Sequence, residues 1–152
     1  MNRYDRYDSK IKLSEWAFII FAVGFYPMLS SMYPLLPPFI GIAGLIILKT
    51  MDKNIIYPLS AMLYLIHLDL NLSLPFMMSI FSIIFINMFI YPTTKLVLRC
   101  KSCLNLFMIF FIDGFYYISL FLYDIVFDVS TIKADYILGY YILLDMFVGL
   151  FI

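Results

Sequence analysis

The chain has 152 residues, of which 64% are hydrophobic and 13% charged, and its mean hydropathy is +0.99. An ordinary soluble domain is about 45–50% apolar and about 25% charged, so this composition excludes a soluble fold and predicts an integral membrane protein. The Phe and Ile content excludes a disordered chain, and a formal net charge of zero with no basic face excludes a nucleic-acid-binding protein.

Apolar runs separated by charges, prolines or polar clusters predict a compact all-α bundle of about six transmembrane helices. A helix needs about 20 residues to cross a hydrocarbon core about 30 Å thick, and the first, fourth and fifth runs are long enough. The second run is short and opens with Pro34, Pro37 and Pro38, so the first two runs could instead form a re-entrant hairpin. The predicted helices are residues 15–33, 35–48, 54–70, 72–91, 103–127 and 136–152; residues 1–14 form a basic N-terminal segment, and residues 15–152 form a single transmembrane domain whose longest loop is 92–102.

The Lys and Arg residues predict the orientation of the bundle. Of the ten in the chain, all but Lys133 lie in the N-terminal segment, after the second run or after the fourth run. Cytoplasmic loops carry the excess of Lys and Arg, so both termini are expected in the cytoplasm and the protein in the bacterial cytoplasmic (inner) membrane. Residues 27–31 would make a poor signal-peptidase site, so the first run is expected to be retained.

Two aspartates lie deep inside predicted spans, where an Asp costs roughly 2.5–3.5 kcal/mol to insert. Asp113 is in the fifth run and Asp145 in the sixth, and no Lys or Arg lies inside any run. Each carboxyl group must therefore be protonated, hydrogen-bonded, open to a wet cavity or paired with another chain. Helical spacing predicts three polar stripes that face a common interior. They comprise Ser60, Tyr64, His67 and Asp69 on the third run; Asp113, Tyr117, Leu120, Asp124 and Asp128 on the fifth; and Tyr141, Asp145 and Gly149 on the sixth.

The stripe residues have two alternative roles, and both remain open. They could join helices by hydrogen bonds, at about 0.6 kcal/mol each, or they could serve a partner or a ligand. His67 is expected to form a hydrogen bond near a helix end rather than to bind a metal. Gly41, Gly44 and Gly139 are expected to permit close contact between helices.

Cys100 and Cys103, the two cysteines of the chain, form a C-x-x-C pair at the edge of a predicted helix. Such a pair could be half of a metal site, a redox pair or a lipidation site. A structural zinc site needs four ligands, so two reduced cytoplasmic thiols without essential chemistry are expected instead. The sequence holds no H-E-x-x-H, G-x-S-x-G or phosphate-loop motif, so no enzymatic activity, metal or cofactor is expected.

Several segments resemble MreD, the rod shape-determining membrane subunit of bacteria, which is a six-span protein of similar length with a short basic N-terminus. The similarity covers most of the chain and lies mainly in its topology, and Ser60 and Ala61 stand where that family has glycines. The similar segments are Pro37-Pro38-Phe39 at the start of the second span, Leu68-Asp69-Leu70 near the end of the third, residues 72–91, Phe111-Ile112-Asp113 followed by residues 116–122, and residues 141–152.

The resemblance implies a non-enzymatic scaffold of the cell-elongation machinery. Such a scaffold would link MreC, a periplasmic partner with a single span, to the cytoskeleton and the peptidoglycan synthases. The MreD fold is in turn similar to the substrate-binding subunits of energy-coupling-factor transporters. The alternative function is therefore a membrane-embedded subunit for the uptake of a vitamin-type small molecule, and a third alternative is a helix-packing subunit of another complex.

Overall fold

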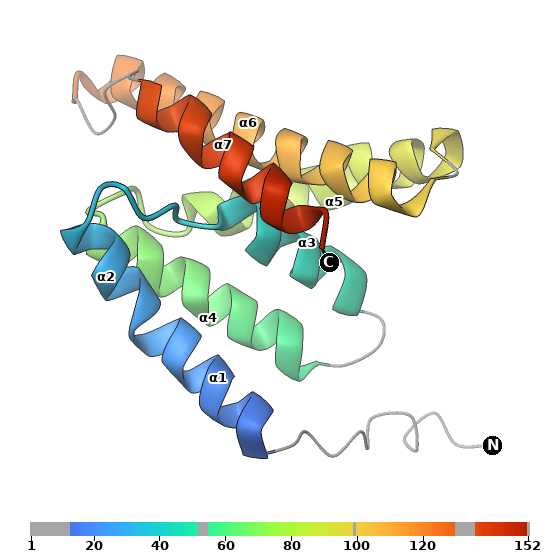
Figure 1. The fold of residues 1–152 in the computed structure, drawn as a ribbon. Helices are drawn as coiled ribbons and strands as arrows, with labels where there is room; N and C mark the ends of the chain where they lie inside the picture. Colours follow the sequence, from blue (N-terminus) through green and yellow to red (C-terminus); the bar gives the residue numbers. More distant parts are fainter. Residues whose placement is uncertain (1–12, 52–54, 99, 130–135, 152) are drawn as a thin grey trace.

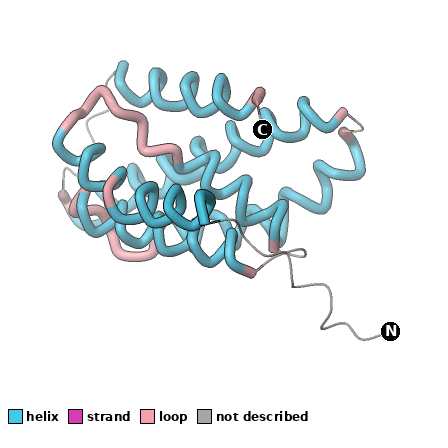
Figure 2. The backbone as a smooth tube through the Cα atoms, turned by 60° about the horizontal axis from the view of Figure 1, so that its bottom comes forward, coloured by secondary structure: helices cyan, strands magenta, loops and turns pink. Residues whose placement is uncertain are grey.

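The computed structural model describes residues 13–51, 55–98, 100–129 and 136–151, and within these ranges all regular secondary structure is α-helical (Figure 1). The predicted all-helical fold is thus confirmed. Helix α2 continues the direction of α1, the helices after it run back and forth, and the loop at residues 33–39 runs inward (Figure 2). The helices are α1 (Leu13–Gly24), α2 (Tyr26–Met32), α3 (Ile40–Thr50), α4 (Ile56–Asn71), α5 (Met78–Val97), α6 (Lys101–Phe127) and α7 (Tyr136–Gly149).

Three helical stretches are long and apolar enough to cross a membrane, as expected for a helical membrane protein. They are α1 and α2 together (Leu13–Met32), α5 and α6. Helices α3 and α7 are also apolar but have only 11 and 14 residues. At 1.5 Å per residue they are about 16 Å and about 21 Å long, well short of a hydrocarbon core of about 30 Å.

Prolines explain why the second predicted helix begins late. The sequence predicts a helix from residue 35, but α3 begins at Ile40. Pro34, Pro37 and Pro38 cannot donate a backbone hydrogen bond, and each disfavours a helical conformation in the residue before it. Residues 33–39 therefore form no helix, and Phe39 enters α3 with a left-handed φ of 47°.

The fourth predicted helix, residues 72–91, is displaced along the chain to Met78–Val97. Residues 72–77 form a turn instead, with Ser73 at a φ of 54° and Met77 at a φ of 62°. At the other end α5 continues through Pro92, which the sequence analysis had assigned to a loop. The predicted long loop at 92–102 is wrong for this reason, because α5 and α6 are separated only by residues 98–100.

Helix α3 lies at the centre of the bundle and contacts α4, α5, α6 and α7 (Figure 1). Gly44 allows this close packing, because a Cβ atom there would lie 3.0 Å from the Ile112 side chain on α6. Gly139 on α7 has no described atom within 4 Å of an added Cβ, so the predicted close helix contact at this residue is wrong. Helix α1 contains no buried residue and contacts only α2 and α4 among the described helices.

Candidate functional site

The N-terminus of α3 meets a carboxyl group inside the bundle. The first N–H groups of a helix have no partner within it, and Phe39 supplies no side-chain cap to α3. Asp145 on α7 replaces that cap, because the Gly41 N–H donates to its Oδ2 at 2.9 Å. Helix α7 is thereby joined to the start of α3 by a buried, charge-assisted hydrogen bond.

A second carboxyl group, that of Asp113 on α6, faces the same helix end. A Cβ atom at Gly41 would lie 2.7 Å from Asp113 Oδ2 and 2.8 Å from Oδ1, so only glycine leaves room for this carboxyl. Asp113 and Asp145 are each 2% exposed and lie within hydrogen-bonding range of each other. One oxygen of each carboxyl group, Asp113 Oδ2 and Asp145 Oδ1, has no hydrogen-bond donor among the described residues.

The non-helical segment before α3, residues 33–39, is held by tyrosines from three helices. Tyr26 on α2 donates to the Pro37 carbonyl at 2.8 Å, and Tyr64 on α4 donates to the Pro38 carbonyl at 2.5 Å. Tyr141 on α7 donates to the Pro34 carbonyl. Backbone groups outside a helix must find partners inside a membrane protein, and these hydroxyl groups satisfy three carbonyls of the segment.

A separate polar cluster joins α4, α5 and α6. Asp69 Oδ2 accepts hydrogen bonds from Ser79 Oγ at 2.7 Å and from the Ser79 N–H at 3.4 Å. Asp69 Oδ1 accepts from the Tyr116 hydroxyl at 3.1 Å. All three side chains are buried, and both oxygens of Asp69 have donors. Asp69 therefore caps α5 as Asp145 caps α3.

The two helix starts share a local pattern that the sequence analysis missed. Each follows a proline, Pro37 or Pro75, and enters the helix through a residue with positive φ that provides no side-chain cap. In each, the second helical residue, Gly41 or Ser79, donates its N–H to an aspartate of another helix. The similarity extends over Leu36-Pro37-Pro38-Phe39-Ile40-Gly41-Ile42 and Leu74-Pro75-Phe76-Met77-Met78-Ser79-Ile80.

His67 forms the kind of hydrogen bond that the sequence predicts. Its Nδ1 lies 2.8 Å from the carbonyl oxygen of Val23 on α1. Pro27, four residues after Val23, has no N–H to bond this carbonyl within the helix. His67 therefore compensates for Pro27 in the first turn of α2, and it joins α4 to α1.

The structure distributes the predicted stripe residues over several places. Tyr64, Asp113 and Asp145 lie together at the start of α3. Tyr117, on α6, lies close to the carboxyl groups of Asp113 and Asp145. Ser60 instead donates to the Tyr57 carbonyl of its own helix at 2.8 Å. Asp69 belongs to the α5 cap, Asp124 lies half-buried about three turns beyond Asp113, and Asp128 is the exposed C-cap of α6.

Three residues of these two sites, Tyr26, Ser79 and Tyr116, were missed from the sequence, and Gly41 was expected only as a point of close helix contact. Tyr26 and Tyr116 resemble the other aromatic residues of an apolar run, and Ser79 resembles an isolated helix-packing serine. Gly41 contributes only its backbone N–H. The one available signal was the pair of proline-containing turns, because each precedes a helix that lacks its own cap.

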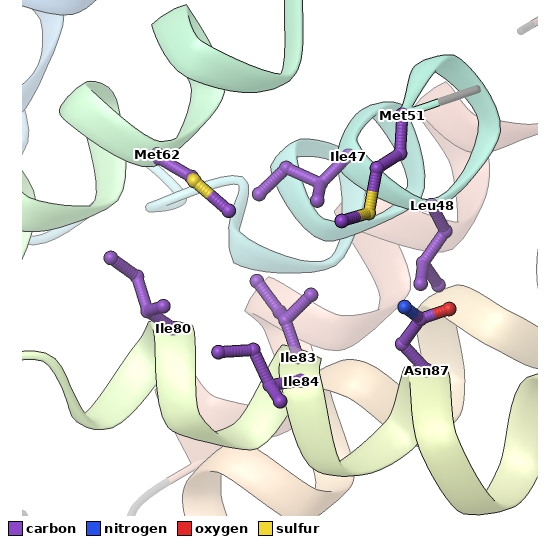
Figure 3. Close-up of a pocket in the computed structure, with 8 residues that line it drawn as sticks. All are labelled: Ile47, Leu48, Met51, Met62, Ile80, Ile83, Ile84 and Asn87. Carbon is purple, nitrogen blue, oxygen red and sulfur yellow. The ribbon is translucent and has the colours of Figure 1, made fainter.

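A small cavity lies elsewhere, between α3, α4 and α5 (Figure 3). Its volume is about 30 Å³, which is similar to the volume per molecule in liquid water. The amide of Asn87 lies beside Leu48 at one edge, and the other lining side chains are apolar. The cavity is a packing gap and is too small for a vitamin-sized ligand. Its lining residues are Ile47, Leu48, Met51, Met62, Ile80, Ile83, Ile84 and Asn87.

The cysteine pair lies at the start of α6, with Cys100 as the N-cap residue and Cys103 in the first turn. Both thiols are exposed and unbridged. A hydrogen bond from the Cys103 thiol lowers the pKa of Cys100. Within the described part of the chain, no group of three or more His, Cys, Asp or Glu residues could hold a metal ion.

Comparison with known proteins gave no match to a family model, to a curated protein or to a solved structure.

Proposed function

We propose that the chain is a non-enzymatic scaffold subunit of the bacterial cell-shape and elongation machinery, similar to MreD. It lies in the cytoplasmic membrane as a bundle of about six spans with both termini in the cytoplasm. It links an MreC-like periplasmic partner to the cytoskeleton and to peptidoglycan synthesis. One observation carries the proposal. The polar side chains inside the bundle bind the chain's own helices to one another, while the exterior of the bundle is apolar.

The interior polar groups support a structural role. Asp145, Tyr64 and Tyr141 bind the backbone of residues 34–41, and Asp69 binds Ser79 and Tyr116. The first three contacts hold the start of the short helix α3 against α4 and α7. A protein with little chain outside its helices can act on partners mainly through its helix surfaces.

Helix α1 offers the least covered of these surfaces. None of its residues is buried, and Phe18 and Phe21 are 72% and 56% exposed. Its contacts with α2 and α4 leave the opposite face to lipid or to another transmembrane helix. A single-span partner such as MreC could pack on this face without any change in the bundle.

The basic residues of the structure support the orientation. Lys49 lies in the last turn of α3, Lys95 in the last turn of α5, and Lys101 begins α6. Because successive helices alternate in direction, these three residues stand at one end of the bundle (Figure 1). The positive-inside rule assigns that end to the cytoplasm.

Purification of the full chain from membranes of its host in a mild detergent, followed by mass spectrometry, tests the scaffold. We expect an MreC-like coiled-coil protein and wall synthases to copurify. The double change Phe18→Ala/Phe21→Ala should reduce their recovery, whereas Phe110→Ala/Phe121→Ala on the exposed face of α6 should not. Recovery of a transport ATPase in place of these partners would contradict the proposal.

One feature favours the alternative, a vitamin-type uptake subunit. Helix α3 begins inside the bundle at a carboxyl pair, after a non-helical segment, and transporters commonly bind substrates or ions at such broken helices. Native mass spectrometry of the detergent-purified chain distinguishes the two functions. A tightly bound small molecule that is lost in Asp145→Leu but kept in Asp69→Leu would favour the uptake subunit.

A further inference from the structure

The two orphaned oxygens of the bundle belong to the same pair of carboxyl groups. Asp113 Oδ2 and Asp145 Oδ1 are buried without a donor, while the carboxyl groups themselves lie within hydrogen-bonding range. A carboxylate has no hydrogen to donate, so two carboxylates leave both oxygens unsatisfied. A single proton on one carboxyl group would supply a donor to the pair, because its O–H could donate to the other carboxyl group.

The surrounding side chains do not supply the missing donor. The hydroxyl groups of Tyr26, Tyr64 and Tyr141 are committed to proline carbonyls, and Tyr117 on α6 reaches neither orphaned oxygen. These four tyrosines are the described titratable groups that face the pair from α2, α4, α6 and α7.

The basic residues of the neighbouring helices are distant from the pair. On α3, Lys49 lies about 12 Å beyond Gly41 along the helix axis. On α6, Lys101 lies about 18 Å from Asp113 along the helix axis, and Lys95 is in the last turn of α5. Because none of the described basic residues is shown to contact it, a doubly negative pair would place two like charges close together inside an apolar bundle.

The backbone of α3 decides which carboxyl carries the charge. Asp145 Oδ2 accepts the N–H of Gly41 at 2.9 Å, at the positive end of the α3 dipole. Hydrogen bonds of this kind favour the ionised form of the acceptor. Asp113 is therefore the residue that keeps the proton.

We infer that Asp113 and Asp145 form a one-proton site, in which protonated Asp113 donates to the Asp145 carboxylate at the N-terminus of α3. The proton joins α6 to α7, and the carboxylate joins both to α3. The ligand of the site is a proton, and its occupancy fixes the start of the central helix. This inference is independent of the scaffold or uptake role.

Infrared spectroscopy of the full chain in lipid nanodiscs at neutral pH tests the site. A protonated, buried carboxyl group gives a C=O stretching band that carboxylates lack. We expect this band in the unaltered protein and its loss in Asp113→Asn. Asp69→Asn is the matched control, because buried Asp69 has donors on both oxygens and should be ionised. The band should therefore survive in that variant.

Isotope labelling gives a second measurement that needs no mutation. Growth with aspartate carrying ¹³C at the side-chain carboxyl should shift the band in the unaltered protein. A band that is absent, that does not shift on labelling, that persists in Asp113→Asn or that disappears in Asp69→Asn would overturn the one-proton site. Circular dichroism of each variant verifies that its helices remain folded.

Discussion

The Gly41 N–H of α3 donates to the carboxylate of Asp145 on α7, across 104 positions of sequence. Neither residue can be exchanged freely, since a Cβ atom at Gly41 would collide with Asp113 and the loss of Asp145 would uncap α3. The hydrogen bond therefore links the stability of the central helix to that of the last described helix.

Replacement of Gly41 by Ala should destabilise the fold by about 1–3 kcal/mol, because the new methyl group overlaps the Asp113 carboxyl. Gly114→Ala is the matched control, since no described atom lies within 4 Å of a Cβ added there. That change should be neutral or should stabilise α6 by up to about 1 kcal/mol. Thermal unfolding in detergent measures both; equal stability of the two variants would contradict the close approach at Gly41.

Asp113→Asn should be nearly silent, because the amide can donate to Asp145 as the proposed O–H does. Asp113→Leu should destabilise the bundle by about 1–3 kcal/mol, since it leaves Asp145 Oδ1 without a donor. Unfolding temperature and function should be compared at equal abundance in the membrane. If Asn and Leu impair function equally at normal abundance, the scaffold role of this residue fails and the uptake subunit is favoured.

Tyr116→Phe removes one of the donors to Asp69 and should lower the free energy of unfolding by about 1.5–3 kcal/mol. Tyr140→Phe changes an exposed tyrosine on α7 and should leave stability unaltered. Chemical denaturation followed by circular dichroism measures the difference. A result in which both variants match the unaltered protein would exclude a stabilising role for the Asp69 cluster.

Cys100 should react with iodoacetamide before Cys103, because its lowered pKa leaves more thiolate at a given pH. The difference should be largest near neutral pH and should vanish at strongly alkaline pH, where both thiols are ionised. Mass spectrometry after a short pulse of reagent gives the order of reaction. The double change Cys100→Ser/Cys103→Ser should preserve function and abundance, and a loss of function in a folded variant would restore the metal or redox interpretation.

A reporter fused after Ile152 should be active when its activity requires the cytoplasm and inactive when it requires the periplasm. The expectation follows from the distribution of Lys and Arg, nearly all of which precede or follow spans on one side. The reverse pattern of activity would invert the proposed topology.

The sequence predicts some helices well because their limits are encoded locally. Helix α6 was expected at residues 103–127 and spans Lys101–Phe127, since polar and basic residues adjoin its start and a long apolar run follows. Helices α3 and α5 begin later than expected because a proline-containing turn precedes each of them, and their caps come from Asp145 and Asp69 on other helices. The turns leave a local pattern in the sequence, but the contacts with the distant aspartates do not.

The sequence likewise identifies some residues of the candidate site but not the groups that bind them. Asp113 and Asp145 were identified because a carboxyl group deep in an apolar run is costly, and Tyr64 because it lies at helical spacing from Ser60 and His67. The groups that bind them were not identifiable. A glycine N–H is present in every glycine, and the hydroxyl of Tyr116 is hidden in an aromatic run of low polarity.

The shortness of α3 has a consequence for biosynthesis. Eleven apolar residues preceded by three prolines make a weak insertion signal, and the helix cannot be capped until Asp145 has been translated. During synthesis the segment must wait at the translocon or at the membrane surface while four further helices emerge from the ribosome. The arrival of α7 then completes the fold. A chain that is truncated before Asp145 would form a bundle whose central helix has no acceptor for the Gly41 N–H.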